Sequence, residues 1–284
     1  MTSDGTGGAW LSIVGIGEDG VEGLVPSIRS LIASAALVAG GRRHLQLVEG
    51  LARGRTLPWS SPMDASLEEV LAQHGQSVVV LASGDPFEHG VGALLARRLE
   101  PREWASYPQP SAFSLAANRM GWALQDVARI GLNGRAIERL RPLLQPGARI
   151  LALSTDGSTP GAVARYLASL GFGPSRISVL EAMGGPHERS RAGTAAALDA
   201  EGIAPLNTLA IEVIAEPRAR ILPLVAGLPD DWLEHDGQIT KREHRAITLS
   251  SLAPRRGEHL WDIGCGSGSV AIWGKGMSSS SASA

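Results

Sequence analysis

Two glycine-rich loops have residue types and spacings that suit the binding of a nucleotide or a nucleotide-like cofactor. Residues 15–20 (GIGEDG) follow a short apolar run and match the G-x-G-x-x-G dinucleotide fingerprint. Glu18 and Asp19 count against a pyrophosphate cradle because they place two carboxylates inside the loop. The acidic residue expected roughly 20 positions further on for a ribose is absent from residues 38–43. We therefore favour a tight strand-to-helix turn that lines a cleft.

The second glycine loop is more specific for a methyl-donor cofactor. Residues 262–268 (DIGCGSG) have the spacing D-x-G-x-G-x-G at the end of an apolar run. Glycine at every second position lets the backbone pass closely beneath a bound adenosylmethionine. The alternative is one more strand-to-helix turn, in which Cys265 is only a small spacer between two glycines.

The segment SGDPF at residues 83–87 follows the clearest strand candidate, residues 77–82. Ligands of open parallel sheets bind beyond the carboxyl ends of the strands, so this segment is well placed for a site. Gly84 would let a ligand approach the backbone, and Asp85 would accept bonds from ligand donors or lie near a positive sulfonium. The alternative is that Asp85 caps the helix beginning near Gly90, and spacing alone leaves both interpretations open.

A third candidate group follows the second expected strand and consists of Gly40, Gly41, Arg42, Arg43 and His44. Arginine binds carboxylates through a bidentate fork, so this group suits a polycarboxylate substrate. The residue types alone favour the plainer alternative of a solvated helix start. The seven histidines form no H-E-x-x-H or C-x-x-C pattern, and we expect no protein metal site.

The elements that must position these residues alternate between strand and helix. The expected strands are residues 10–14, 37–39, 77–82, 149–153, 177–180, 209–214 and 258–263. The expected helices are residues 26–36, 66–73, 91–99, 111–120, 159–171 and 241–252. This alternation predicts parallel βαβ units and an α/β fold. The proline-rich segment 107–110 is the expected junction between two subdomains.

Composition narrows the class of protein. The chain has 284 residues, 44% of them hydrophobic, and a net charge of −2, which argues against binding to nucleic acid or an anionic membrane. The longest apolar stretch, residues 31–40, is about half of what a membrane span requires. No signal peptide is visible, and the single cysteine excludes an intrachain disulfide. A reducing cytoplasm is the expected compartment.

Seven blocks carry a resemblance to a known family. In chain order they are GIGEDG, AGGRRHL, LASGDPF, QPSAFSLAANRMGW, LSTDGSTP, VLEAMGGPHER and LNTLAIEV. They resemble the N-terminal domain of the precorrin-6Y C(5,15)-methyltransferase (decarboxylating) family of cobalamin biosynthesis. Residues 234–272 resemble the opening of the same family's C-terminal domain.

The resemblance implies a tetrapyrrole methylase (class III methyltransferase) fold of two α/β subdomains, with the cofactor in the trough between them. The implied domain spans residues 8–216, with the subdomain boundary near residue 108. Residues 217–273 are then expected to be the truncated start of a class I Rossmann-like methyltransferase domain. Residues 274–284 are expected to be a disordered serine and alanine tail.

The resemblance also implies site residues, a cofactor and partners. The cofactor is S-adenosylmethionine, and the residues implied to bind it are Gly84, Asp85, Ser111, Ala112, Met183 and Gly184. The residues implied to face a tetrapyrrole substrate are Gly40, Gly41 and Arg42. A homodimer is the implied assembly. No catalytic residue is assigned.

The implied reaction is methyl transfer to carbon 5 of a precorrin of the precorrin-6Y or precorrin-7 type, without the decarboxylating step at carbon 15. Glu88 and His89 depart from the family, which has an aromatic pair there, and they put acceptor recognition in question. The alternative is an inactive remnant that binds S-adenosylmethionine. A nicotinamide oxidoreductase is a third hypothesis, against which the acidic first loop argues.

Overall fold

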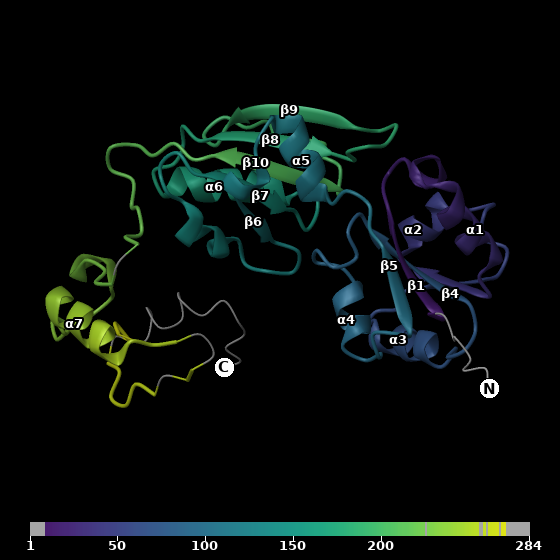
Figure 1. Ribbon diagram of the computed structural model, residues 1–284. Coiled ribbons are helices and arrows are strands. Elements are labelled where there is room, and N and C mark those ends of the chain that lie inside the picture. The colour runs from purple at the N-terminus through teal and green to yellow at the C-terminus, as the bar shows by residue number, and fades with distance from the viewer. Residues whose placement is uncertain (1–8, 225, 256–257, 260, 267, 271–284) are drawn as a thin grey trace.

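The computed structural model describes residues 9–270 except 225, 256–257, 260 and 267. Two five-stranded sheets, each flanked by helices, form two lobes that follow one another along the chain (Figure 1). The first sheet is parallel throughout, with the order β3-β2-β4-β1-β5. Its strands are β1 (Leu11–Ile16), β2 (Leu37–Gly40), β3 (Arg55–Pro58), β4 (Val78–Ser83) and β5 (Trp104–Tyr107).

The helices of the first lobe connect these parallel strands. They are η1 (Gly20–Gly23), α1 (Pro26–Ser34), α2 (Arg42–Leu47), α3 (Asp64–Leu71) and α4 (Gly92–Ala96). Pro26 occupies the first turn of α1, as expected, because its fixed φ suits that position and its missing N–H costs no helical bond. Strand β1 is buried along its whole length and β4 along all but its last residue, which agrees with their apolar runs.

The second sheet has the order β6-β7-β10-β8-β9 and is mainly antiparallel. Its strands are β6 (Val127–Gly131), β7 (Arg149–Leu153), β8 (Arg176–Glu181), β9 (Arg189–Thr194) and β10 (Asn207–Glu212). The prediction of parallel units throughout is wrong here, since only β6 and β7 run parallel. One reason is that β8 reaches β9 through a short loop, and only antiparallel neighbours can be joined without a crossover. In addition, β10 lies between β7 and β8 and runs antiparallel to both.

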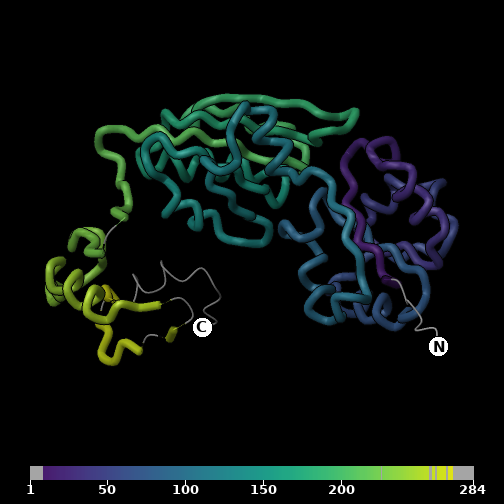
Figure 2. Tube along the Cα trace, in the orientation of Figure 1, coloured from purple at the N-terminus to yellow at the C-terminus, as the bar shows by residue number. Residues whose placement is uncertain are grey.

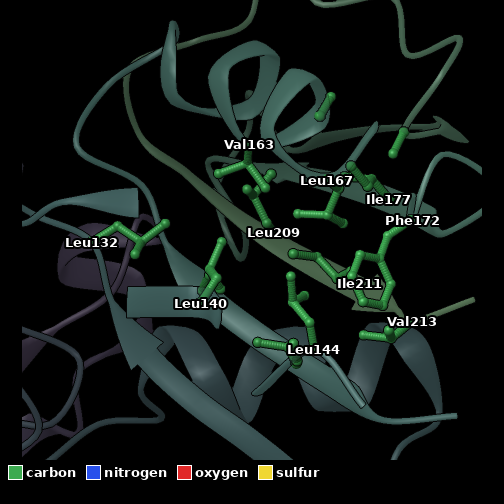
Figure 3. Packing of buried hydrophobic residues seen from close by; sticks show 14 of the residues in the cluster. Leu132, Leu140, Leu144, Val163, Leu167, Phe172, Ile177, Leu209, Ile211 and Val213 are labelled. Atoms are coloured by element: carbon green, nitrogen blue, oxygen red, sulfur yellow. The ribbon is translucent and has the colours of Figure 1, made fainter. Parts of the chain in front are cut away.

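Two helices cover opposite faces of the second sheet. They are α5 (Ala112–Met120) and α6 (Thr159–Ser169), accompanied by the short turns η2 (Leu124–Asp126) and η3 (Ile137–Leu143). Alternate residues of β10 divide between the two faces: Leu209 and Ile211 pack with α6, and Ala210 packs with α5. Figure 3 shows the α6 side of this core, where Val163 and Leu167 meet the strand.

Helix α5 begins where the first lobe ends. Ser111 is its N-cap, and the Ser111 side chain accepts a hydrogen bond of 3.2 Å from the backbone N–H of Ser114. Gly121 ends the helix in the left-handed conformation at φ +64°. The expected helix at residues 111–120 is therefore confirmed, and the proline-rich junction leads directly from β5 into it.

Residues after β10 lead away from the second sheet to a small helical unit (Figure 2). It contains η4 (Asp230–Trp232) and α7 (Arg242–Leu252). Arg245 is fully buried within it, pairs with Asp230 at 2.6 Å and donates 2.5 Å to the Leu228 carbonyl. A buried guanidinium needs such partners, so this residue holds the unit together. The Trp232 ring lies within 6 Å of the guanidinium carbons of Arg141 and Arg220.

The strand expected at residues 258–263 is a wrong prediction, because the described residues there form no strand. Trp261 and Ile263 are 85% and 93% exposed. A strand needs a hydrogen-bonded neighbour, and no described strand lies beside this segment. The expected tail at residues 274–284 lies outside the described part of the chain. Among the helices of residues 9–270 that the structure describes, none has the length and apolar character to span a membrane.

A cleft between the two lobes

Two adjoining cavities lie between the lobes, one of about 580 Å³ and one of about 70 Å³. Both are lined by the carboxyl end of the first sheet and by strand ends of the second. The residues that line both cavities are Ser83, Ala112, Leu206, Asn207 and Thr208. The shared wall makes the cavities two compartments of one cleft, with a volume in the range that small-molecule sites occupy.

The smaller cavity has mainly apolar walls. Ile16 and Gly84 approach it from the first lobe, and Leu115, Leu180 and Met183 approach it from the second. Strands β1 and β4 are neighbours and run parallel, so their carboxyl ends reach the same edge of the sheet. The position of the cavity therefore follows from the general rule for ligands of open parallel sheets.

Close backbone packing shapes this edge. The Gly84 N–H donates a hydrogen bond of 3.1 Å to the Ile16 carbonyl, and the Gly84 carbonyl accepts one of 3.1 Å from the N–H of Gln109. A Cβ atom on Gly15 would lie 1.8 Å from the Gly84 oxygen, and one on Gly84 would lie 2.7 Å from the Pro110 oxygen. Gly15 therefore serves a tight approach of two backbone segments. This agrees with our interpretation of the first glycine loop as a turn at the wall of a cleft.

A polar cluster lies where the two cavities meet the first lobe. Arg43 pairs with Glu18 and donates 2.8 Å to the hydroxyl of Ser83. His44 Nε2 lies 3.0 Å from Arg43 Nη2 and 2.8 Å from the Ser83 hydroxyl. The pKa of His44 is lowered to about 4, mainly by burial and to a smaller extent by the positive charge of Arg43.

His44 is therefore neutral at pH 7, and its tautomer follows from its neighbours. An arginine can only donate, so His44 Nε2 accepts the bond from Arg43 and Nδ1 carries the hydrogen. Nδ1 is buried without a hydrogen-bond partner among the described residues, and His44 lines the larger cavity. The site thus holds an unused N–H donor beside a cation.

Four of the six residues proposed for the cofactor line the cleft. Gly84, Ala112 and Met183 line the smaller cavity, and Ser111 lines the larger one. Asp85 does not line either cavity; its Oδ1 accepts a hydrogen bond of 2.8 Å from the N–H of Phe87, which closes a local Asx turn. The alternative of a helix cap does not hold, because α4 begins at Gly92 without a side-chain cap.

Gly184, the sixth residue, lies outside the lining too. It donates 2.7 Å from its backbone N–H to a carboxylate oxygen of Glu188. Arg119 on α5 donates 2.5 Å and 2.9 Å to the two oxygens of the same carboxylate. These bonds hold the pKa of Glu188 down at about 2, with the Arg119 bond as the largest cause. Glu188 thus anchors the loop that carries Met183.

The residues proposed for the substrate lie beside the cleft. Gly40, Gly41 and Arg42 are absent from the lining, and Arg42 is exposed at the start of α2. Successive residues of a helix point about 100° apart, so Arg43 and not Arg42 turns toward the cavities. A Cβ atom on Gly41 would lie 3.4 Å from His44 Nδ1, so this glycine leaves room for the histidine.

Sequence reasoning did not identify Arg135 or Ser154, and it indicated Asn207 only as part of the loop before Thr208, which the resemblance implies to be a wall of the cofactor site; all three residues line the larger cavity. Ser154 and Asn207 lie in the blocks LSTDGSTP and LNTLAIEV, whereas no motif marks Arg135. A second signal is the position at strand ends, since β7 ends at Leu153 and β10 begins at Asn207. The antiparallel pairing of these strands, which sequence reasoning did not predict, brings both ends to the cleft.

Glu88 and His89, which depart from the expected aromatic pair, contact the second lobe. Glu88 lines the larger cavity and pairs with Arg129 of β6 at 2.6 Å. The His89 ring meets the ring of Phe113 on α5 edge-on, with centroids 5.9 Å apart. The charge at Glu88 is therefore compensated, and the loop after β4 is tied to the opposite wall of the cleft.

The Glu188 anchor gives a prediction. Glu188→Gln should weaken binding of S-adenosylhomocysteine, the demethylated form of the proposed cofactor, about fivefold at pH 7, because one neutral partner replaces a charge-assisted pair. The folded-state pKa lies below the unfolded one, so the stabilisation is present above pH ~4.3 and is lost as the pH falls toward 2. Urea unfolding of both proteins across this range measures it. A stability difference that stays constant down to pH 2 contradicts the anchor.

In a comparison with known proteins, two family profiles match two separate parts of the chain. The family profile described as tetrapyrrole (corrin/porphyrin) methylases matches residues 11–199, and the one described as a precorrin methyltransferase domain matches residues 231–284. Precorrin-6Y C(5,15)-methyltransferase [decarboxylating] of Sinorhizobium sp is 54% identical over 93% of this chain and 64% of its own length. The chain thus spans less than two thirds of that relative.

Two further similarities each cover about two thirds of the chain. Cobalt-precorrin-7 C(5)-methyltransferase of Salmonella typhimurium is 28% identical over 63% of this chain and 88% of its own length. The crystal structure of uroporphyrin-III C-methyltransferase from Thermus thermophilus, complexed with S-adenosylhomocysteine, superposes with a TM-score of 0.55 at 19% identity. The superposition covers 71% of this chain and 96% of that structure, which shows a common fold.

Proposed function

The chain belongs to the tetrapyrrole (corrin/porphyrin) methylase family, and from this premise we propose that it transfers a methyl group from S-adenosylmethionine to carbon 5 of a precorrin. The cleft between the lobes is the observation that supports this proposal, since its smaller compartment has apolar walls that suit part of the cofactor and its larger compartment has room for the acceptor. The Salmonella relative named for C(5) methylation matches a length of chain similar to that of the first domain.

The smaller cavity suits part of the methyl donor by its chemistry. Its apolar walls suit the adenine ring and the carbon atoms around the sulfur, and the bare backbone at Gly84 leaves room for a close approach. S-adenosylmethionine supplies a methyl group made electrophilic by the sulfonium when it is bound. Gly84, Ala112 and Met183 would hold it, with Ser111 at the border of the larger cavity. We propose Asp85 and Gly184 as neighbours that shape the two loops.

Catalysis in this site consists of positioning and exclusion of water. The new bond joins the methyl carbon to a nucleophilic ring carbon of the acceptor, the bond from sulfur to methyl breaks, and its electron pair stays on sulfur. The acceptor loses a proton in a later step. Apolar side chains such as Leu115, Leu180 and Met183 keep water from the reacting atoms. The two compartments hold the partners in line, which supplies most of the acceleration.

The larger cavity suits an acidic macrocycle. Precorrins carry several carboxylate side chains, and the cavity lining includes Arg135 together with His44 and His89. Arg135 is exposed and has no ion-pair partner among the described residues. Arg43 lies next to His44 at the border of the two cavities. We propose that these groups bind acceptor carboxylates; Gly40, Gly41 and Arg42, which lie outside the lining, remain predicted contacts.

Arg135 provides the test of this acceptor site. Arg135→Ala should raise the KM for the precorrin about fivefold, because one partly exposed ion pair to the substrate is lost. The affinity for S-adenosylhomocysteine should stay unchanged, since Arg135 lines only the larger cavity. Arg139→Ala is the matched control, as it is equally exposed a few residues along the chain. Steady-state kinetics and calorimetry measure both constants, and a loss of cofactor affinity in Arg135→Ala would refute the separation of the two compartments.

A mass-spectrometric assay tests the proposed reaction. The full chain is incubated with S-adenosylmethionine and precorrin-6Y, and methyl groups gained and carbon dioxide lost are counted. One methyl group at carbon 5 without loss of carbon dioxide is the expected result. Binding of S-adenosylhomocysteine without turnover would replace the proposal by the inactive remnant, and binding of NAD instead would replace it by an oxidoreductase.

The organisation of the chain completes the proposal. We propose a methylase domain at residues 8–216, divided near residue 108, and a segment of a second methyltransferase domain from residue 217. This division is supported by the two separate profile matches. We further propose that the protein works in the cytoplasm as a homodimer, which gel filtration with light scattering tests.

A further inference from the structure

Two buried polar atoms at the wall of the larger cavity have no hydrogen-bond partner among the residues that the structure describes. They are the hydroxyl oxygen of Ser154 and the side-chain oxygen of Asn207, and both residues are 6% exposed. A buried polar group without a partner costs free energy, and native proteins rarely leave one without a reason. Two such atoms on the wall of one cavity therefore point to a ligand that completes them.

The orientation of Asn207 is determined by its surroundings. Its amide nitrogen lies 3.1 Å from the Asp156 carbonyl oxygen and 2.8 Å from the Ala204 carbonyl oxygen. Only an N–H group is compatible with these acceptors, so the oxygen must be the atom left without a partner. The Asn207 backbone in turn accepts a hydrogen bond of 3.3 Å from the N–H of Ser154, which keeps the two residues adjacent.

We propose that Ser154 and Asn207 form a hydrogen-bond station for an N–H group of the methyl acceptor. The amide oxygen of Asn207 can only accept, so it disfavours a carboxylate, and the Ser154 hydroxyl can accept as well; together they suit a donor. This inference rests on the proposed function and deepens it. The cations of the cavity bind the acidic rim of the acceptor, and the station recognises a nitrogen of its ring system.

The same chemistry has a second source, the amino group of the cofactor's adenine. The placement favours the acceptor, because Ser154 lines only the larger cavity while Asn207 lines both. The two sources make different predictions. If Ser154 and Asn207 bind the acceptor, substitution of Ser154 affects the acceptor KM alone. If they bind adenine, the same substitution affects the affinity for S-adenosylhomocysteine.

The test compares two buried serines in the full-length protein. Ser154→Ala removes an oxygen without protein partners, so it should leave the urea midpoint unchanged or raise it, while the KM for precorrin-6Y rises about tenfold. Ser175→Ala is the matched control. Ser175 is fully buried and lines neither cavity. Its hydroxyl donates a hydrogen bond of 3.2 Å to the Ile214 carbonyl and accepts one of 2.9 Å from the Ile214 N–H. It should lower the urea midpoint and leave the KM unchanged.

The outcomes separate the inference from the proposed function. If the wild-type chain methylates precorrin-6Y and Ser154→Ala has an unchanged KM, the station is wrong while the function stands. A tenfold weaker affinity for S-adenosylhomocysteine with an unchanged acceptor KM overturns the acceptor assignment in favour of adenine. If the wild-type chain neither binds nor methylates precorrin-6Y, the proposed function itself fails.

Discussion

Gly84→Ala is expected to lower the free energy of unfolding by about 3 kcal/mol and to weaken S-adenosylhomocysteine binding more than tenfold. Two effects add at this position. Gly84 has φ +51°, a left-handed conformation that costs an alanine about 1–2 kcal/mol. The new Cβ would also lie 2.7 Å from the Pro110 oxygen and 2.9 Å from the Ser111 Cα. Both collisions involve backbone, so the loop that lines the cofactor cavity must move.

Gly202→Ala separates these two effects. Gly202 has φ +62°, close to that of Gly84, but no atom lies within 4 Å of its would-be Cβ. The control should therefore lose only the conformational part, about 1 kcal/mol, and keep its affinity for the ligand. Urea unfolding and calorimetry on the two variants measure the difference. Equal losses of stability and of affinity in both would show that the contact with Pro110 does not shape the site.

Glu181→Gln is expected to lower the free energy of unfolding by about 3 kcal/mol, as breaking a buried ion pair does. The Glu181 carboxylate is fully buried at the end of β8, two residues before Met183. It accepts a hydrogen bond of 2.8 Å from Arg189 and one of 2.5 Å from the backbone N–H of Ala204. One of its oxygens lies 3.5 Å from the Arg191 guanidinium. Replacing the charge leaves these donors poorly paired beneath the cofactor loop.

The pH dependence of this variant follows from the shifted pKa. Burial by itself raises the pKa of Glu181, but hydrogen bonds from Arg189 and Ala204 outweigh it and the pKa is lowered. A lowered folded-state pKa means that the charge stabilises the fold above pH ~4.3 and that this contribution is lost as the pH falls further. The wild type and Glu181→Gln should therefore converge in stability below this pH.

Glu212→Gln is the matched control for Glu181→Gln. Glu212 lies on β10 in the same sheet, and its two ion pairs with Arg149 and Arg176 are 3.9 Å long and partly exposed. Such pairs contribute at most about 1 kcal/mol, so the variant should be nearly as stable as the wild type. Similar midpoints for the two variants in urea would contradict the role of the buried carboxylate.

The expected elements with strong local signals agree with the structure. The apolar runs of β4 and β7, the proline at the start of α1 and the serine cap of α5 were all predictable, because each signal lies within a few residues. The four missed strands are β3, β5, β6 and β9, which are the edge strands of the two sheets and are less buried than the central strands. An edge strand buries little, so its sequence carries no apolar run.

The candidate site likewise contains residues that the sequence identifies and residues whose place in the site depends on the tertiary structure. Gly84, Ser111, Ala112 and Met183 are identifiable because a glycine or a helix start in a familiar block marks them. Asn207 and Ser154 also lie in such blocks, but only the pairing of β7 with β10 shows that they come together at the cleft. Arg42 and Arg43 could not be told apart, because the direction of each side chain depends on where α2 begins and how it packs.

The sequence by itself determined where the chain must turn, which segments must be buried and to which family it belongs, since these depend on residue type and short spacing. The tertiary structure alone decided that the second sheet is mainly antiparallel and that its strand ends close the cleft over the first sheet. It also decided which polar atoms remain unpaired there. Strand order and the facing of two lobes arise from contacts between residues far apart in the chain, and no local pattern encodes them.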